Sequence, residues 1–225
     1  MMDDIIRRYN PEYSVFINCP FDSDYKHLFD ALVFTVVCCG LTPLCARAYV
    51  DPSKARLARL IELISFAKYS IHDLCRCHGE GSRNYARLNM PLELGISIGL
   101  SSANMITAGG QHVDRNRWHL LVHNRMEEVA YQRFVSDLQG SDPFSHSETQ
   151  QTVIAATMNI FAVACEVTFL HNPTEIFGAL ATYEKKLRDH TAMWYGELPW
   201  HDTLRIALQV AQEYDLITNT SGSAH

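Results

Sequence analysis

The stretch "YSVFINCPFDSDYKHLFDALVFTVVCCG" (residues 13–40) decides how the chain begins to fold. Residues 13–19 form a short apolar run, rich in residues that favour β-structure, and the run ends at Pro20. Such a run is typical of a buried strand. Residues 24–40 then carry apolar side chains at helical spacing and stop at Gly40, which predicts a helix with a C-terminal stop.

The same alternation of strand and helix continues to residue 138. Further strands are expected at residues 41–48, 69–74 and 117–124. Further helices are expected at residues 51–67, 87–102 and 130–138, with Ser53 as the cap of the first and Asn89 near the start of the second. Alternation of this kind indicates a parallel sheet with helices on both faces. Right-handed crossovers then favour four or five parallel strands in the order 2-1-3-4.

The last third of the chain changes character. Helices are expected at residues 148–170, 172–190 and 201–216, with no strand between them. A boundary near residues 143–148 therefore gives an α/β domain (1–145), a C-terminal helical region (146–217) and a disordered tail (218–225). The helix at 148–170 is apolar on more than one face. We expect it to be covered in a homodimer or larger assembly; the alternative is that the three helices bury one another.

Composition excludes several classes of protein. The net charge of −6 and the pI near 6.0 argue against duplex nucleic acid as the main partner. No run of about 18 apolar residues predicts a membrane span, and the charged start "MMDDIIRRYNPEY" is not typical of a signal peptide. The seven cysteines include Cys38, Cys39, Cys45 and Cys165 in apolar segments. We expect buried thiols, no disulfides and a reducing cytoplasm.

Ligands of open α/β sheets bind beyond the carboxyl ends of the strands. The expected strand ends and the helix at 87–102 bring these candidates to that edge: Asn18, Phe21, Asp22, Arg47, His72, Asp73, Asn89, Glu93, His123 and Asn124. Each residue type is common there for structural reasons, so their convergence is what indicates a site. No metal is expected, because the cluster Cys75, Cys77 and His78 lacks a second pair of ligands.

Glu93 is the strongest single candidate, because it is the only charged side chain between Arg87 and Asp114. If Asn89 caps the helix, Glu93 lies in the first turn, where the macrodipole favours an anion. The apolar helix around it predicts a partly dry pocket. A carboxylate there suits a nucleophile, or a group that stabilises a cationic transition state. The alternative is a first-turn acid without a catalytic role.

Other candidates also have two interpretations. Asp73 either caps the loop after its strand or contacts a substrate. Asp22 or Asp24 is expected to cap the helix at 24–40, with Asp24 slightly favoured over Asp22. Arg47 either binds a phosphate or pairs with an acid.

Two motifs resemble known enzyme families over residues 13–145. "YSVFINCPFDSDY" resembles the first strand and loop of TIR-type domains, and "HD" followed by "NMPLELGISIG" resembles the catalytic region of nucleoside 2-deoxyribosyltransferases. The combination of "VFINCPFD" and "NMPLELG" also resembles a bacterial branch near these groups. Both families have a flavodoxin-like sheet and cleave N-glycosidic bonds.

The resemblance implies roles for three residues. Glu93 matches the Glu that attacks the anomeric carbon of the sugar, and Asp73 and Asn89 match positions that contact the sugar. This chain departs from the pattern at Asn89, where the transferases usually have an acid. The resemblance further implies a bacterial stress or phage-defence role, with a possible partner protein.

The sequence therefore leaves two alternative functions. The first is an enzyme that cleaves the base–sugar bond of a nucleoside, a nucleotide or NAD through Glu93, by hydrolysis or transfer. The second is a non-catalytic module that senses a nucleotide with the same pocket and oligomerises. Neither needs a cofactor, since NAD would be a substrate.

Overall fold

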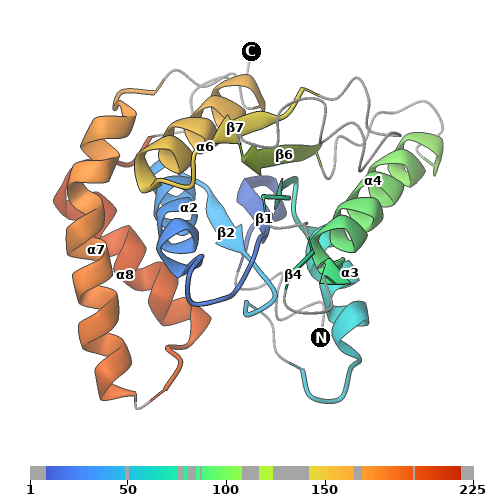
Figure 1. The fold of residues 1–225 in the computed structure, drawn as a ribbon, viewed down its shortest axis with the longest axis horizontal. Helices are drawn as coiled ribbons and strands as arrows, with labels where there is room; N and C mark the ends of the chain where they lie inside the picture. The colour runs from blue at the N-terminus through green and yellow to red at the C-terminus, as the bar shows by residue number, and fades with distance from the viewer. Residues whose placement is uncertain are drawn as a thin grey trace.

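The structure is a computed structural model of the chain, and it describes residues 9–48, 51–75, 79–80, 85–86, 88–107, 117–123, 142–164, 169–194 and 196–218. Five parallel strands form a central sheet in the order β2-β1-β3-β6-β7 (Figure 1). The strands are β1 (Ser14–Asn18), β2 (Thr42–Leu44), β3 (Tyr69–Asp73), β6 (Arg117–His123) and β7 (Phe144–His146). Counted along the chain the order is 2-1-3-4-5, so the expected flavodoxin-like α/β sheet is confirmed.

Helices cover both faces of this sheet, as expected. They are α2 (Lys26–Cys38), α3 (Arg56–Phe66), α4 (Asn89–Thr107), α6 (Gln150–Ala164), α7 (Pro173–Met193) and α8 (Trp200–Glu213). Helices α2 and α6 lie on one face and α3 and α4 on the other, while α7 and α8 pack outside α2 (Figure 1). A 3₁₀ turn, η1 (Pro11–Tyr13), precedes β1, and β4 (Gly79–Glu80) pairs antiparallel with β5 (Tyr85–Ala86). The helix expected at 130–138 and residues 219–225 of the expected tail lie outside the described residues. Thr218 is described and is buried, and its N–H donates to the carbonyl oxygen of Cys38 at 2.9 Å, so the expected disorder at residue 218 was wrong.

The sequence allowed a fifth strand but did not predict where β7 lies. Strand β7 has three residues and falls within the stretch where the domain boundary was placed. Three residues are too few to show an alternating pattern. β7 pairs in parallel with β6, and His146 lies opposite His123. On the other side, Asn18 at the end of β1 lies opposite His72 of β3, so the carboxyl ends of these strands share one edge.

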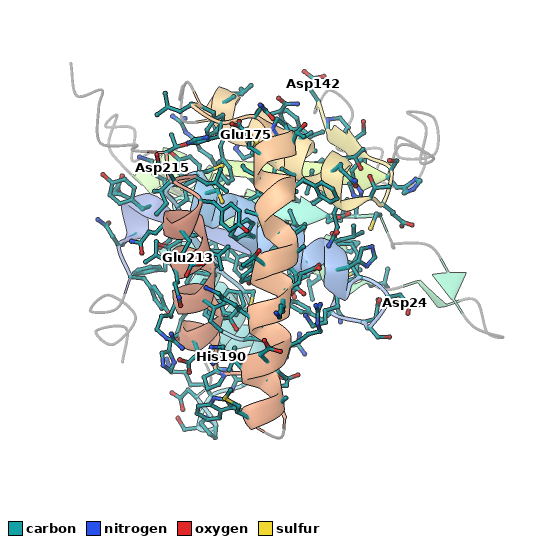
Figure 2. The ribbon with its side chains drawn as sticks, turned by 90° about the vertical axis from the view of Figure 1, so that its left-hand side faces the viewer. Asp24, Asp142, Glu175, His190, Glu213 and Asp215 are labelled. Atoms are coloured by element: carbon teal, nitrogen blue, oxygen red, sulfur yellow. The ribbon has the colours of Figure 1, made fainter. Side chains whose placement is uncertain are left out.

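The C-terminal helices share a hydrophobic core with the sheet. Tyr183 of α7 stacks on Phe34 of α2, with 5.0 Å between ring centroids, and Phe161 of α6 meets Tyr69 of β3 edge to face at 6.2 Å. The buried side of α6 contacts α2 and α7, so helices of the same chain already cover this apolar side. The outer sides of α7 and α8 carry polar groups such as Glu175 and Glu213 (Figure 2).

Helix α3 begins later than the sequence predicted. Ala55 occupies its N-cap position and makes no side-chain cap hydrogen bond. Ser53 instead bonds locally, because its N–H and its Oγ lie 2.9 Å and 2.6 Å from Oδ1 of Asp51. Asp and Ser side chains commonly compete with helix formation in this way. The expected Ser53 cap was therefore wrong, and within the part of the chain that the structure describes no cap side chain accepts from the first-turn amides of α3.

Helix α4 opens at Asn89, as expected, but Asn89 is not its cap. The carbonyl oxygen of Leu88 accepts the Leu92 N–H at 3.0 Å, so Leu88 occupies the cap position. Glu93 is then the fifth helical residue, and the first turn of α4 contains no acid. The macrodipole is felt mainly within the first turn. The expected first-turn placement of Glu93 was wrong, and other forces must set its charge.

Two further expectations from composition concern cysteines and membranes. Cys38, Cys39 and Cys45 are buried and free, as are Cys19 and Cys75, while Cys165 lies outside the described residues. Among the helices that the structure describes, none has the length and apolar character needed to cross a bilayer.

Candidate functional site

Asn18 joins β1, β3 and the start of α4. Its Nδ2 donates to the carbonyl oxygen of Met90 at 2.9 Å and lies 2.9 Å from Nδ1 of His72. An amide nitrogen only donates, so Nδ1 of His72 accepts and the ring proton lies on Nε2. That Nε2 is 3.0 Å from Oγ of Ser70, which pairs at 2.8 Å with Oγ of Ser97 on α4. These buried side chains tie α4 to two strands.

Burial lowers the pKa of His72 to about 3, so its imidazole stays neutral. A neutral ring can accept from Asn18 and donate to Ser70 at the same time. The network therefore fixes where α4, and with it Glu93, sits above the strand ends.

Asp73, at the end of β3, is fully buried and accepts three hydrogen bonds. Its Oδ2 accepts from the Tyr25 hydroxyl and from Nε2 of His146 at 3.0 Å, and its Oδ1 accepts from the Cys75 N–H at 2.8 Å. Burial alone would raise the pKa of Asp73. The bonds from His146, Tyr25 and Cys75 outweigh burial and hold that pKa below its usual value, so the carboxylate is ionised.

A second link runs from Asp73 to β6. Nδ1 of His146 accepts the Glu148 N–H at 3.2 Å, so the proton of a neutral His146 ring lies on Nε2, facing Asp73. Glu148 has a φ of 55°, which costs a non-glycine residue on the order of 1 kcal/mol. Its Oε2 lies 4.0 Å from Nε2 of His123. Tyr25, Asp73, His146, Glu148 and His123 thus form one chain of polar groups.

Asp73, Cys75 and His146 also offer one possible metal ligand each, and these three atoms lie within 4.8 Å of one another. Zn²⁺ accepts such donors. However, the Glu148 N–H occupies Nδ1 of His146, and a metal at Nε2 would have to displace the proton donated to Asp73. Hydrogen bonds already satisfy this cluster, so it fits a polar network better than a metal. Of the cluster considered from the sequence, Cys77 and His78 lie outside the described residues.

Glu93 is 7% exposed and differs from Asp73 in its environment. Burial raises the pKa of Glu93 to about 7, partly offset by the charge of Arg56. The protonated and ionised forms therefore coexist near neutral pH. Both Glu93 and Asp73 act on the Cys19 thiol, whose pKa is raised first by burial and then by the Asp73 and Glu93 charges. Cys19 thus stays protonated, which excludes it as a ready nucleophile.

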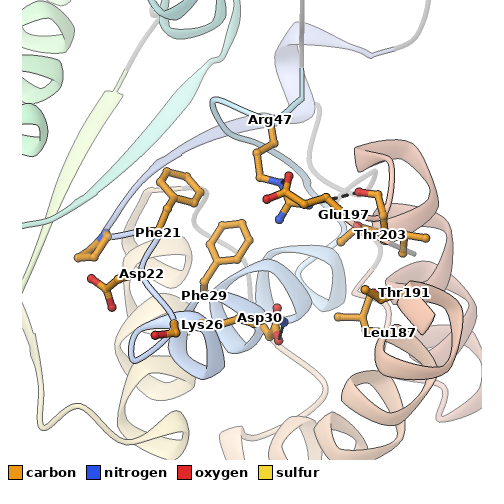
Figure 3. A pocket seen from close by; sticks show the side chains of 14 residues that line it. Phe21, Asp22, Lys26, Phe29, Asp30, Arg47, Leu187, Thr191, Glu197 and Thr203 are labelled. Atoms are coloured by element: carbon orange, nitrogen blue, oxygen red, sulfur yellow. Dashed lines mark hydrogen bonds and ion pairs between the residues drawn. The ribbon is translucent and has the colours of Figure 1, made fainter. Parts of the chain in front are cut away.

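A cavity of about 220 Å³ opens beside Phe21, between α2, α7 and the segment before α8 (Figure 3). Phe21 is 45% exposed and meets Phe29 edge to face at 5.3 Å. Figure 3 shows these two rings between Arg47 on one side and Lys26 with Asp30 on the other. Burial raises the pKa of Asp30 and the adjacent Lys26 lowers it, with burial prevailing. This cavity therefore combines aromatic walls with charges of both signs.

A second cavity, of about 290 Å³, lies beyond the ends of β1 and β2 against α3. Its lining is Phe21, Ala46, Arg47, Arg56, Arg59, Leu60, Leu63 and Glu197. The two cavities are neighbours, since both are lined by Phe21, Arg47 and Glu197. Neither Glu93 nor Asp73 is among the described lining residues of either cavity.

The candidates named from the sequence fall into separate groups. Buried together at the strand ends are Asn18, His72, Asp73 and His123; on α4 are Asn89 and Glu93; at the cavities are Phe21, Asp22 and Arg47. Asn124 lies outside the described residues. Neither Asp24 nor Asp22 caps α2, because Tyr25 occupies the N-cap position and makes no side-chain cap hydrogen bond; Oδ1 of Asp22 accepts the Tyr25 N–H at 2.9 Å in the turn before the helix.

Sequence reasoning missed Tyr25, His146, Arg56 and Arg59. Tyr25 and His146 gain their role only from long-range contacts with Asp73. Arg56 and Arg59 carried a usable signal, since residues three apart lie on the same face of a helix. The late start of α3 puts that face at its N-terminus, next to Arg47.

Comparisons with protein-family models, with curated proteins and with solved structures find no match for this chain. The chemistry of the described residues therefore carries the functional argument.

Tyr25→Phe should lower the free energy of unfolding by about 1–3 kcal/mol, because it removes a donor to the buried Asp73 carboxylate. The matched control is Tyr183→Phe. The Tyr183 hydroxyl is also buried, but has no hydrogen-bond partner among the described residues. Its removal should be neutral or stabilising by up to about 1 kcal/mol. Urea denaturation measures both, and equal losses would contradict the assigned role of Tyr25.

Glu93→Gln should stabilise the fold at pH 8 but not at pH 4. The folded-state pKa of about 7 lies above the ordinary value of 4.5 for a glutamate carboxyl. The buried charge therefore costs stability as pH rises past 4.5, and the cost is complete above about pH 7. At about 1.4 kcal/mol for each pKa unit, the gain at pH 8 is at most about 3.5 kcal/mol.

The control for this measurement is Glu197→Gln, whose side chain is 84% exposed. It should change the free energy of unfolding by less than about 0.5 kcal/mol at either pH. A Glu93→Gln effect that does not differ between pH 4 and pH 8 would show that the Glu93 charge is not buried at a cost.

Proposed function

We propose that the chain is an N-glycosidase that cleaves the base–sugar bond of a nucleoside, a nucleotide or NAD, by hydrolysis or transfer, with Glu93 as the reacting carboxylate. The observation that carries the proposal is the environment of Glu93. It is buried at the carboxyl edge of the sheet, has a pKa of about 7 and lies within the electrostatic reach of Arg56. Carboxylates perturbed in this way are candidates for catalysis.

Cleavage of an N-glycosidic bond leaves positive charge on the sugar, while the base departs with the bonding electrons and gains a proton. A carboxylate beneath the anomeric carbon stabilises that charge, or forms a sugar ester that water later breaks. Only the ionised form of Glu93 can act in this way. Its poor solvation strengthens its interaction with a sugar cation relative to the same carboxylate in water.

The remaining candidates contribute in different ways. Asn89 is exposed in the first turn of α4 and is available to a sugar hydroxyl. Asp73 would contact the sugar only by giving up a hydrogen bond from Tyr25 or His146. The exposed ring of Phe21 offers a face on which a base can stack.

A nucleotide sensor without catalysis is the second candidate function. It is favoured by one observation, the absence of Glu93 and Asp73 from the described linings of both cavities. A sensor returns its ligand unchanged, whereas an N-glycosidase releases a free base.

The resemblance to TIR-type domains and deoxyribosyltransferases supports a bacterial stress or antiviral defence role, alongside a partner protein. Five free, buried cysteines among the described residues support a location in a reducing cytoplasm. No cofactor is proposed, because the carboxylate chemistry needs none.

Glu93→Gln should lower the rate of base release on the order of 100-fold or more, because it keeps the shape and removes the charge. The measurement is chromatography of free bases after incubation with NAD, nucleosides and nucleoside monophosphates. The wild-type rate should rise with pH and level off above about pH 7, as the Glu93 carboxyl ionises. The exposed Glu213→Gln on α8 is the matched control and should keep the rate. Equal rates of base release for Glu93→Gln and wild type would show that Glu93 is a helix residue without a catalytic role. Binding of the ligand without release of a base would favour the non-catalytic nucleotide sensor.

We also propose a homo-oligomer. The sequence pointed to the helix at 148–170 as the contact, yet α2 and α7 cover the buried side of α6. Large apolar side chains nevertheless remain exposed, among them Val163 at 69% and Leu170 at 79% within residues 148–170 and Leu88 at 69% before α4, which supports assembly. Light scattering at micromolar concentration should give at least twice the chain mass of 25.5 kDa. A mass of one chain would contradict assembly.

A further inference from the structure

We propose that the second cavity, lined by Arg47, Arg56 and Arg59 and called here the arginine cavity, binds a phosphate or pyrophosphate group. The ligand would then be a phosphorylated nucleoside rather than a free nucleoside. Only this choice of substrate class rests on the function proposed above; the phosphate site itself does not.

The arginine cavity lies where an open α/β sheet receives ligands. Phe21 follows β1 and Arg47 follows β2, so the cavity opens beyond the carboxyl ends of two neighbouring strands. Arg56 and Arg59 reach it from the start of α3. Its volume of about 290 Å³ leaves room for a phosphate with part of a sugar.

The charges around the cavity are unbalanced. Among the described lining residues there are three guanidinium groups and one carboxylate, that of Glu197, in a chain whose net charge is −6. Glu197 is 84% exposed and lies 3.5 Å from Nε of Arg47, so it offsets one cation weakly. Guanidinium groups bind phosphate through paired, charge-assisted hydrogen bonds. An anion with two negative charges would match the excess positive charge.

The start of α3 adds donors to the same place. Arg56 is its first helical residue, and Ala55 at the N-cap provides no side-chain acceptor for the first-turn amides. Unsatisfied amides at a helix start favour a phosphate, and here they accompany the arginines instead of standing alone.

Two of the arginines are already held in position. Nη1 of Arg59 donates to the carbonyl oxygen of Asp51, and Nη2 of Arg47 donates to that of Leu198 at 3.2 Å. These contacts reduce the side-chain entropy that would be lost on binding. The cavity is therefore partly preorganised for an anion.

Arg56 also connects the arginine cavity with Glu93. Its charge is the one that offsets the effect of burial on that carboxyl. A phosphate held by Arg56 would thus lie near the proposed reacting group, as expected where one ligand carries both a phosphate and a scissile base–sugar bond.

Isothermal titration calorimetry of the full chain with pyrophosphate and with inorganic phosphate, at low ionic strength, tests the site directly. The wild type should bind pyrophosphate, with weaker binding as salt is added. Arg56→Gln should weaken binding on the order of 10-fold, as expected for the loss of one charged donor. Arg188→Gln is the matched control, because Arg188 is exposed on α7 and is not among the lining residues of either cavity. Arg188→Gln should bind pyrophosphate as the wild type does.

A wild type that does not bind pyrophosphate at millimolar concentration would overturn the inference. So would equal weakening by Arg56→Gln and Arg188→Gln, with circular dichroism used to show that both variants are folded. Arg47→Gln provides a second variant if Arg56→Gln fails to fold. Because pyrophosphate has no base, this result does not depend on catalysis.

Paired substrates separate the two proposals. If base release is found, Arg56→Gln should lower the preference for a nucleoside 5′-monophosphate over its nucleoside, whereas Glu93→Gln should slow both. Pyrophosphate binding without any base release would support the phosphate site and reject the N-glycosidase activity. Base release with equal preference for both substrates in the wild type would reject the assigned substrate class.

Discussion

The buried carboxylate of Asp73 is the constraint on which the carboxyl edge of the sheet depends. A fully buried charge is tolerated only when donors replace water around it. Here the donors come from three elements: Tyr25 at the start of α2, His146 at the end of β7, and the Cys75 backbone after β3. One ionised group therefore holds together segments that are up to 121 residues apart in the sequence, and losing a donor would leave that charge unpaired.

A second, uncharged network fixes the other side of the same edge. Asn18 bridges His72 and the backbone of Met90, and Ser70 joins Ser97, so β1, β3 and α4 are held at two points. These polar groups are better explained as supports than as substrate contacts, because their hydrogen-bonding groups already face one another. Their indirect effect is to hold α4 so that Glu93 remains in a poorly solvated position.

The two carboxylates at this edge show how environment decides role. Donors lower the pKa of Asp73 and make it a structural anion, whereas burial raises the pKa of Glu93 and leaves it able to change its charge near neutral pH. The arginine cavity lies beyond the ends of β1 and β2, and neither carboxylate is among its described lining residues. In the proposed function this cavity would hold the anionic part of the ligand, while Glu93 would react with the sugar.

The sequence by itself determined the fold class, the parallel order of the first four strands and the burial of the cysteines. It also showed Glu93 as a single carboxylate within an apolar stretch. Apolar periodicity and strand-helix alternation are local properties, so they can be read without knowing what lies next to what. The sequence did not show β7, the late start of α3, or the partners of Asp73. The three-residue strand β7 is recognisable only through its pairing with β6. Ser53 forms its hydrogen bond with Asp51 and does not cap α3. The convergence of Arg47 with Arg56 and Arg59 was likewise decided by tertiary structure, because right-handed crossovers and the packing of α3 bring together side chains that local patterns cannot relate.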